Sequence, residues 1–160
     1  MNPTNLSISR DLGVRGPVIA SERPWVTLDM EYGRTEYRLV RVSLRDNCST
    51  SIIRWNAGIR VPKHRHFGPV HAYTFSGRWH YAEYDWYATA GSYLVEAPET
   101  EHSLVVDEDM EAMFTMFGGM VDLGPDGEVL WYTDAQVSYQ MYVSQLEEMG
   151  LPIPDDLLAD

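Results

Sequence analysis

Histidine is the residue type with the clearest chemical potential in this sequence. Two of the five histidines, His64 and His66, stand two positions apart in the stretch VPKHRHFG. In an extended chain, residues i and i+2 point to the same face, roughly 7 Å apart, so both imidazoles can bind one metal ion. Neutral imidazole suits Zn, Fe, Ni and Cu. Taken alone, the pair is more typical of a solvated basic loop, because Lys63 and Arg65 accompany it.

A third histidine follows a second glycine-led segment. Gly58 precedes His64 with five residues between them, and farther along Gly91 precedes Pro98 and then His102, eleven positions after that glycine. This spacing resembles the two motifs of the cupin superfamily, a Gly, a His-x-His pair, a Glu and a Gly, followed by a Gly, a Pro and a last His. The resemblance covers residues 25 to 132 or so and implies an antiparallel β-barrel of the jelly-roll type.

The acidic position of the first motif is where the sequence departs from the superfamily. That position falls on Val70 or His71, and neither residue is acidic. The resemblance therefore implies a site of three histidines, His64, His66 and His102, in place of a four-ligand manganese site.

A three-histidine site makes the chain similar to the small cupin dioxygenases that cleave carbon–carbon bonds in acetylacetone and 2,4′-dihydroxyacetophenone. The resemblance implies mononuclear non-haem Fe(II), although purified protein can carry Zn, Ni or Mn instead. It also implies a small aromatic or diketone carbonyl substrate together with O2. Three neutral ligands leave the charge of the ion uncompensated and several positions open, which favours an anionic chelating substrate. The alternatives are a non-catalytic metal-binding cupin, acting as a sensor or ligand-binding domain, and a metal-dependent cupin isomerase or hydrolase.

Other side chains are candidates for supporting roles. Glu96, six residues before His102, is expected to orient a ligand imidazole or to handle a substrate proton, or else to be an exposed carboxylate at a strand end. His71 lies in or beside the vacant Glu position, so we assign it a catalytic role in the pocket in preference to ligation of the metal. The expected substrate pocket consists of Tyr73, Phe75, Tyr93, Phe114 and Arg60.

The elements that must position these residues are mostly strands. Between residues 25 and 133, short segments rich in Val, Ile, Tyr, Trp and Thr alternate with turn signals such as Ser76-Gly77 and Gly118-Gly119. This pattern predicts one all-β domain, a cupin-type antiparallel barrel. The expected strands are 25–30, 36–44, 50–56, 71–75, 78–84, 92–97, 103–106, 112–117 and 129–132.

The two ends of the chain differ from this barrel. Residues 1–24 predict an irregular arm, because Pro and Gly interrupt a polar stretch. Residues 134–160 predict a helix and a tail that pack on the barrel or on a partner subunit, in a homodimer or homotetramer. Asp134 is the expected N-cap of a helix over about 135–149, and Gly150 and Pro152 end it.

Composition excludes several classes of function. The 160 residues suit one domain, and 24 acidic against 12 basic residues give a net charge of −12. Such a chain repels phosphate backbones and anionic lipids, so we expect neither nucleic acid nor a membrane as a partner. One cysteine and the absence of an apolar leader predict a cytoplasmic protein. Five Trp, ten Tyr and four Phe are many for this length, and we expect some of them to surround the metal.

Overall fold

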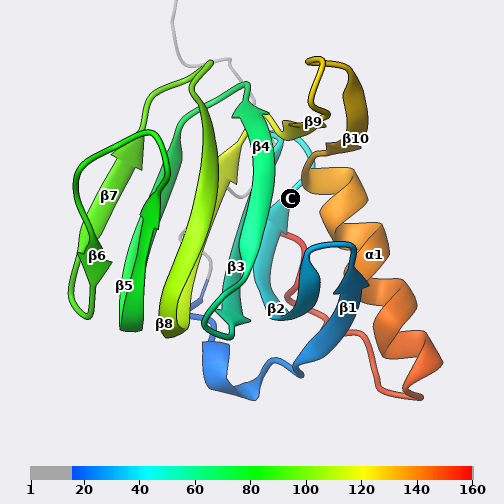
Figure 1. Ribbon diagram of the computed structural model, residues 1–160. Coiled ribbons are helices and arrows are strands. Elements are labelled where there is room, and N and C mark those ends of the chain that lie inside the picture. Colours follow the sequence, from blue (N-terminus) through cyan, green and yellow to red (C-terminus); the bar gives the residue numbers. More distant parts are fainter. Residues whose placement is uncertain (1–15, 160) are drawn as a thin grey trace, which may run out of the picture.

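One antiparallel sheet of ten strands curls around most of the molecule in the computed structural model, which describes residues 16–159 (Figure 1). A short 3₁₀ turn, Ala20–Glu22, precedes the sheet, and one helix follows it. The strands are β1 (Val26–Met30), β2 (Gly33–Ser43), β3 (Cys48–Trp55), β4 (Arg60–His66), β5 (Val70–Tyr81), β6 (Ala88–Thr89), β7 (Tyr93–Glu96), β8 (Glu101–Phe117), β9 (Met120–Leu123) and β10 (Val129–Thr133). The helix is α1 (Ala135–Glu148).

Two long strands, β5 and β8, hold the sheet together. The strand order is β1-β2-β3-β8-β4-β9-β10, while β5 pairs with β6, β7 and β8. The β5–β8 pairing runs from Val70↔Met116 to Tyr81↔Leu104 and shifts register between Thr74 and Trp79. Such bulges bend a strand and increase its twist, so both strands can curl around the interior.

Gly77 lies at the centre of this bend. Its φ is +80°, and a Cβ atom there would lie 2.2 Å from the carbonyl oxygen of Asp109 on β8. Only glycine tolerates both the conformation and the close approach. The sequence predicts a turn at Ser76-Gly77, whereas the structure has a bulge inside one continuous strand.

The interior of the barrel is apolar because alternate residues of each strand face it. Trp79 on β5 is fully buried, and its indole Nε1 donates a hydrogen bond of 3.0 Å to the Thr74 hydroxyl. Its buried neighbours in this cluster include Trp55, Val61, Ala72, Tyr81, Leu104, Val106, Met110 and Ala112.

The helix α1 covers the β1–β2 part of the sheet (Figure 1). Its residues Tyr142 and Leu146 are fully buried, and they pack with Val26, Leu39 and Val42. The hydroxyl of Tyr142 also donates a 2.7 Å hydrogen bond to the carbonyl of Pro24. The helix therefore contacts both the sheet and the segment that precedes β1.

The start of α1 is capped by a side chain, as predicted. The Asp134 carboxylate accepts a 2.8 Å hydrogen bond from the backbone N–H of Val137. We expect Asp134→Ala to lower the free energy of unfolding by about 1 kcal/mol, because one backbone donor loses its partner. Urea unfolding measures this effect, and Asp134→Ser serves as the matched control because serine restores the cap. A loss of equal size in both variants would contradict the capping role.

The predicted fold class, an all-β antiparallel barrel with a C-terminal helix, is confirmed. Three strands, β4, β6 and β9, lie outside the expected strand ranges, and β4 pairs with β9. The expected arm over residues 1–24 lies largely outside the described residues. Within residues 16–159, no helix has the length and apolar character needed to cross a membrane.

Candidate metal centre

Three histidines meet inside the barrel because β4 and β8 are neighbours. His64 on β4 is the register partner of His102 on β8, and His66 follows on the same face of β4. The ring centroids lie 4.9 Å (His64–His66), 4.7 Å (His64–His102) and 5.4 Å (His66–His102) apart. One nitrogen from each ring lies within 4.8 Å of the others, and all three residues are buried.

The charged residues between the histidines face the opposite way. Lys63 Nζ lies 3.1 Å from Glu101 Oε2, and the Arg65 guanidinium pairs with the same carboxylate. These ion pairs lie at the outside of β4, while His64 and His66 are on the inside. The basic stretch is therefore a strand with histidines on its inner face and charged side chains on its outer face, and not a solvated loop.

Burial keeps the histidines on β4 neutral. It lowers the pKa of His64 to about 4 and that of His66 to about 3, because the charged imidazolium loses its hydration inside the barrel. The Nδ1 atom of His64 lies 2.9 Å from the carbonyl of Pro62 and donates to it. This bond leaves the Nε2 lone pair free to bind a cation.

A carboxylate from β7, the strand that pairs with β5, completes the cluster. Glu96 Oε2 lies 3.3 Å from His66 Nε2 and 3.2 Å from His102 Nε2. Glu96 on β7 is the register partner of Val70 on β5, which is one of the two residues at the vacant Glu position of the first motif. A neighbouring strand thus supplies the carboxylate that the motif lacks.

Tyr81 holds this carboxylate and one imidazole in place. Its hydroxyl donates a hydrogen bond to Glu96 Oε1, and its ring stacks on His102 with 3.7 Å between centroids. Burial alone would raise the pKa of Glu96, but the two histidines and the Tyr81 hydroxyl outweigh it and keep that pKa below its ordinary value. Glu96 is therefore a buried anion at neutral pH.

The unsatisfied atoms of the cluster fit a divalent cation. Among the described residues, His66 Nδ1, Glu96 Oε2 and His102 Nε2 are buried without a hydrogen-bond partner. Unpaired buried polar atoms cost free energy. A cation held by the three imidazoles would give His102 Nε2 and Glu96 Oε2 the partner they lack. Neutral imidazoles with one carboxylate nearby suit Fe, Zn, Ni or Mn.

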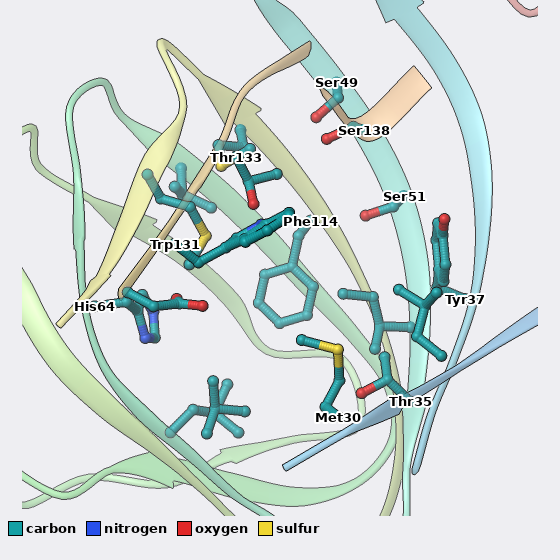
Figure 2. A pocket seen from close by; sticks show the side chains of 18 of the residues that line it. Met30, Thr35, Tyr37, Ser49, Ser51, His64, Phe114, Trp131, Thr133 and Ser138 are labelled. Atoms are coloured by element: carbon teal, nitrogen blue, oxygen red, sulfur yellow. The ribbon is translucent and has the colours of Figure 1, made fainter. Parts of the chain in front are cut away.

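A cavity of about 220 Å³ adjoins the cluster, and both His64 and His66 line it. Its walls are mostly apolar and include Phe114, Met30 and Trp131 (Figure 2). Figure 2 shows His64 at one end of the cavity and the hydroxyls of Ser49, Ser51 and Ser138 at another. The space suits a small molecule that combines an apolar body with a few polar groups.

Several residues expected in the pocket lie outside the barrel. Tyr73, Phe75 and Tyr93 are exposed and do not line the cavity, and this part of the prediction is wrong. His71 also points outward, where its Nδ1 is hydrogen-bonded to the Tyr93 hydroxyl. The reason is alternation: Val70, Ala72 and Thr74 face the interior, so their odd-numbered neighbours on β5 face outward.

Arg60 is displaced from the expected pocket for a different reason. It has the sequence parity of His64, but β4 shifts register between Val61 and His64. The shift turns Val61 inward and leaves Arg60 exposed. Of the predicted residues, Phe114 lines the cavity and Glu96 adjoins the histidines.

Two residues of the site, Tyr81 and Asp122, are not among the site residues predicted from the sequence. Tyr81 shares an alternating pattern with Trp79, which marks both as inward-facing but does not show what Tyr81 contacts. Asp122 on β9 is the register partner of His64, lines the cavity and has its pKa raised by burial. In a strand, Asp122 shares a face with Met120, two residues earlier. This pattern could have identified Asp122 only if the sequence had predicted β9 as a strand.

The barrel and its inward His-x-His pair with a distant third histidine define a cupin. The family model described as the ChrR cupin-like domain matches residues 16–121. The chain therefore belongs to the family of ChrR cupin-like domains. No curated protein matches the chain.

Solved structures share the fold. An RmlC-like cupin protein from Ralstonia eutropha is 23% identical, with a TM-score of 0.82 over 88% of this chain and 92% of that one. A protein of unknown function with a cupin-like fold, also from Ralstonia eutropha, is 26% identical, with a TM-score of 0.79 over 90% and 91%. An acetylacetone dioxygenase from Acinetobacter johnsonii is 17% identical, with a TM-score of 0.78 over 85% and 96%.

Proposed function

We propose that the protein is a mononuclear non-haem Fe(II) dioxygenase that cleaves a carbon–carbon bond in a hydroxyacetophenone- or diketone-type carbonyl compound. The observation that supports it best is the cluster of three buried histidines at the wall of an apolar cavity. The likeness to an acetylacetone dioxygenase agrees with this proposal. Bound iron supplies a Lewis acid for the carbonyl oxygens and a centre at which O2 reacts.

The residues of the chain have separate tasks in this proposal. His64, His66 and His102 hold the metal as neutral ligands. Glu96 lies beside the Nε2 atoms of His66 and His102 and offsets one unit of the positive charge. Phe114 and the other apolar walls exclude water from the chelated oxygens. Because the site keeps a net positive charge, it favours the enolate of a substrate that offers two oxygens.

Oxygen consumption tests the reaction type. Iron-loaded protein is incubated with hydroxyacetophenones and diketones, with and without O2. We expect one O2 to be consumed for each substrate cleaved, and no turnover under anaerobic conditions. Turnover without O2 would contradict the dioxygenase and support a metal-dependent isomerase or hydrolase.

A second candidate is a non-catalytic metal-binding cupin, and the position of Glu96 favours it. With Glu96 Oε2 so close to two ligand nitrogens, three imidazoles and one carboxylate can form a closed four-donor site, which is typical of structural zinc. Metal analysis and chelate binding distinguish the two. Tightly held zinc that excludes chelating ketones supports this second candidate, and iron that binds them supports the enzyme.

The carboxylate itself can be tested by Glu96→Gln. We expect metal affinity to fall about 10- to 100-fold, because the amide keeps the shape but loses the negative charge beside the cation. Competition with a chelator of known affinity measures the change. Tyr81→Phe is the matched control, since it removes one hydrogen bond to Glu96 and leaves the charge, and we expect a smaller loss. Equal affinity in Glu96→Gln and wild type would contradict this role.

A further inference from the structure

A group of hydroxyl side chains lines the cavity far from the histidines, and the candidate metal centre does not use it. Figure 2 shows these residues on the side of the cavity away from His64. They come from β2, β3 and α1, and we call them the hydroxyl end: Tyr37, Ser49, Ser51 and Ser138.

Strand pairing places three of these residues on one inner face. Ser49 and Ser51 are two positions apart on β3, so they point to the same side of the sheet. The next inward position of β3 is Ile53, which is the register partner of Tyr37 on β2. All of these positions line the cavity. The hydroxyl end is therefore built on paired strands, to which α1 adds Ser138.

The hydroxyl of Tyr37 is buried without a partner. Tyr37 is 8% exposed, and its hydroxyl makes no hydrogen bond to any of the described residues. Such a group costs free energy, and phenylalanine would fill the same space without that cost. Burial, with a smaller contribution from Tyr142, raises the pKa of Tyr37, so the hydroxyl stays protonated and can donate. A ligand in the cavity can supply the acceptor that residues 16–159 do not.

The hydroxyl end carries no charge. The described residues that line the cavity include no Lys or Arg, and their one carboxylate, Asp122, is the register partner of His64 at the metal end. An ionised group at the hydroxyl end would lose its hydration with no opposite charge to replace it, which is costly. Hydroxyls can instead both donate and accept hydrogen bonds with an uncharged group.

The wall beside the hydroxyl end is apolar. Ser51 is the register partner of Phe114 on β8, and Ser49 is the register partner of Met116. Both apolar side chains line the cavity. The part of a ligand that adjoins the hydroxyl end must therefore be apolar, and an aromatic ring suits contact with Phe114.

We infer that the hydroxyl end is a second binding subsite, which holds an uncharged hydroxyl or carbonyl group at the far end of a ligand. The inference rests on the proposed function for the other end of that ligand, whose chelating oxygens lie at the histidines. Between the two ends the ligand has an apolar body against Phe114. An aryl ketone with a hydroxyl on the ring opposite its carbonyl has these three parts, whereas a short diketone lacks the far polar group.

Ligand binding to zinc-loaded protein tests this subsite without turnover. Calorimetry compares benzoylacetone with its para-hydroxy and para-carboxy derivatives, which differ only in the group that would reach the hydroxyl end. We expect the para-hydroxy compound to bind about 3- to 10-fold more tightly than benzoylacetone, since it gains one hydrogen bond with a group that is otherwise unpaired. The para-carboxy compound should bind more weakly than benzoylacetone, because its charge is buried without a cation.

Tyr37→Phe removes the unpaired hydroxyl and keeps the ring. We expect this variant to lose about 3-fold or more of the preference for the para-hydroxy compound and to bind benzoylacetone as wild type does. Its free energy of unfolding in urea should not fall, because the hydroxyl has no partner within the described protein. Ser51→Ala should reduce the preference in the same way. Tyr139→Phe on α1 is the matched control, since Tyr139 is half-buried but does not line the cavity, and it should keep the full preference.

Several results would overturn the subsite. These are a para-hydroxy compound that does not bind or binds no better than benzoylacetone, a para-carboxy compound that binds most tightly, and a preference that survives in both Tyr37→Phe and Ser51→Ala. Oxygen consumption separates this inference from the proposed function. Preferential binding without O2 consumption by the iron-loaded protein would support the subsite and contradict the dioxygenase, whereas O2 consumption without the preference would overturn the subsite alone.

Discussion

Replacing His102 with Ala is expected to remove most of the bound metal while the barrel stays folded. His102 is 1% exposed and lies on β8 opposite His64, so its loss takes one of three imidazoles from the cluster. The remaining pair on β4 leaves at least one more coordination position without a protein ligand. The apolar interior around Trp79 is large and does not include this imidazole. Metal content per chain and thermal unfolding measure the two effects.

A matched control for this variant is His80→Ala. His80 lies on β5, where its Nδ1 pairs with Asp107 at 2.8 Å, apart from the three-histidine cluster. We expect His80→Ala to keep its metal. Equal metal content in His102→Ala and wild type would show that the three-histidine assignment is wrong.

Acid is expected to destabilise the metal-free protein well above the range in which ordinary carboxylates titrate. Burial lowers the pKa of His64 to about 4 and that of His66 to about 3, whereas an unfolded histidine has a pKa of about 6.5. Below that value the unfolded chain binds protons that the folded chain excludes. Stability is therefore complete above about pH 6.5 and falls as the pH decreases toward 4. For His64 alone the loss is about 3 kcal/mol.

Urea unfolding in the presence of a chelator, between pH 7.5 and 4.5, measures this loss. In His64→Gln the free energy of unfolding should depend less steeply on pH, because one histidine with a lowered pKa has been removed. A free energy of unfolding that is flat between pH 6.5 and 4.5 would contradict the buried neutral state of the histidines. Saturating metal should shift the loss of stability to lower pH, because protons must then compete with the bound ion for the histidines.

The histidines were predictable because their spacing is local. His64 and His66 share a face through strand alternation alone, and the glycine-led spacing of His102 matches the second cupin motif. The N-cap at Asp134 is local in the same way, since it depends on a hydrogen bond across three residues. Features of this kind follow from backbone geometry over a few residues.

The surroundings of the histidines were less predictable because they depend on pairing between strands. Simple parity places Arg60 beside the ligands, but a register shift in β4 turns it outward. Tyr73 and Phe75 belong to a strong alternating pattern, and alternation does not state which of its two faces is the interior. That choice depends on which face packs against the rest of the barrel.

The sequence by itself determined the class of fold, the three metal-ligating candidates and the departure from the acidic position of the motif. Only the tertiary structure showed that Glu96 lies opposite Val70 and reaches the histidines from β7. It also decided that Tyr81 and Asp122 belong to the site while Tyr73, Phe75 and Tyr93 form an outer face. The physical reason is that spacing along one strand is set by the covalent chain, whereas neighbours across strands are set by register and bulges.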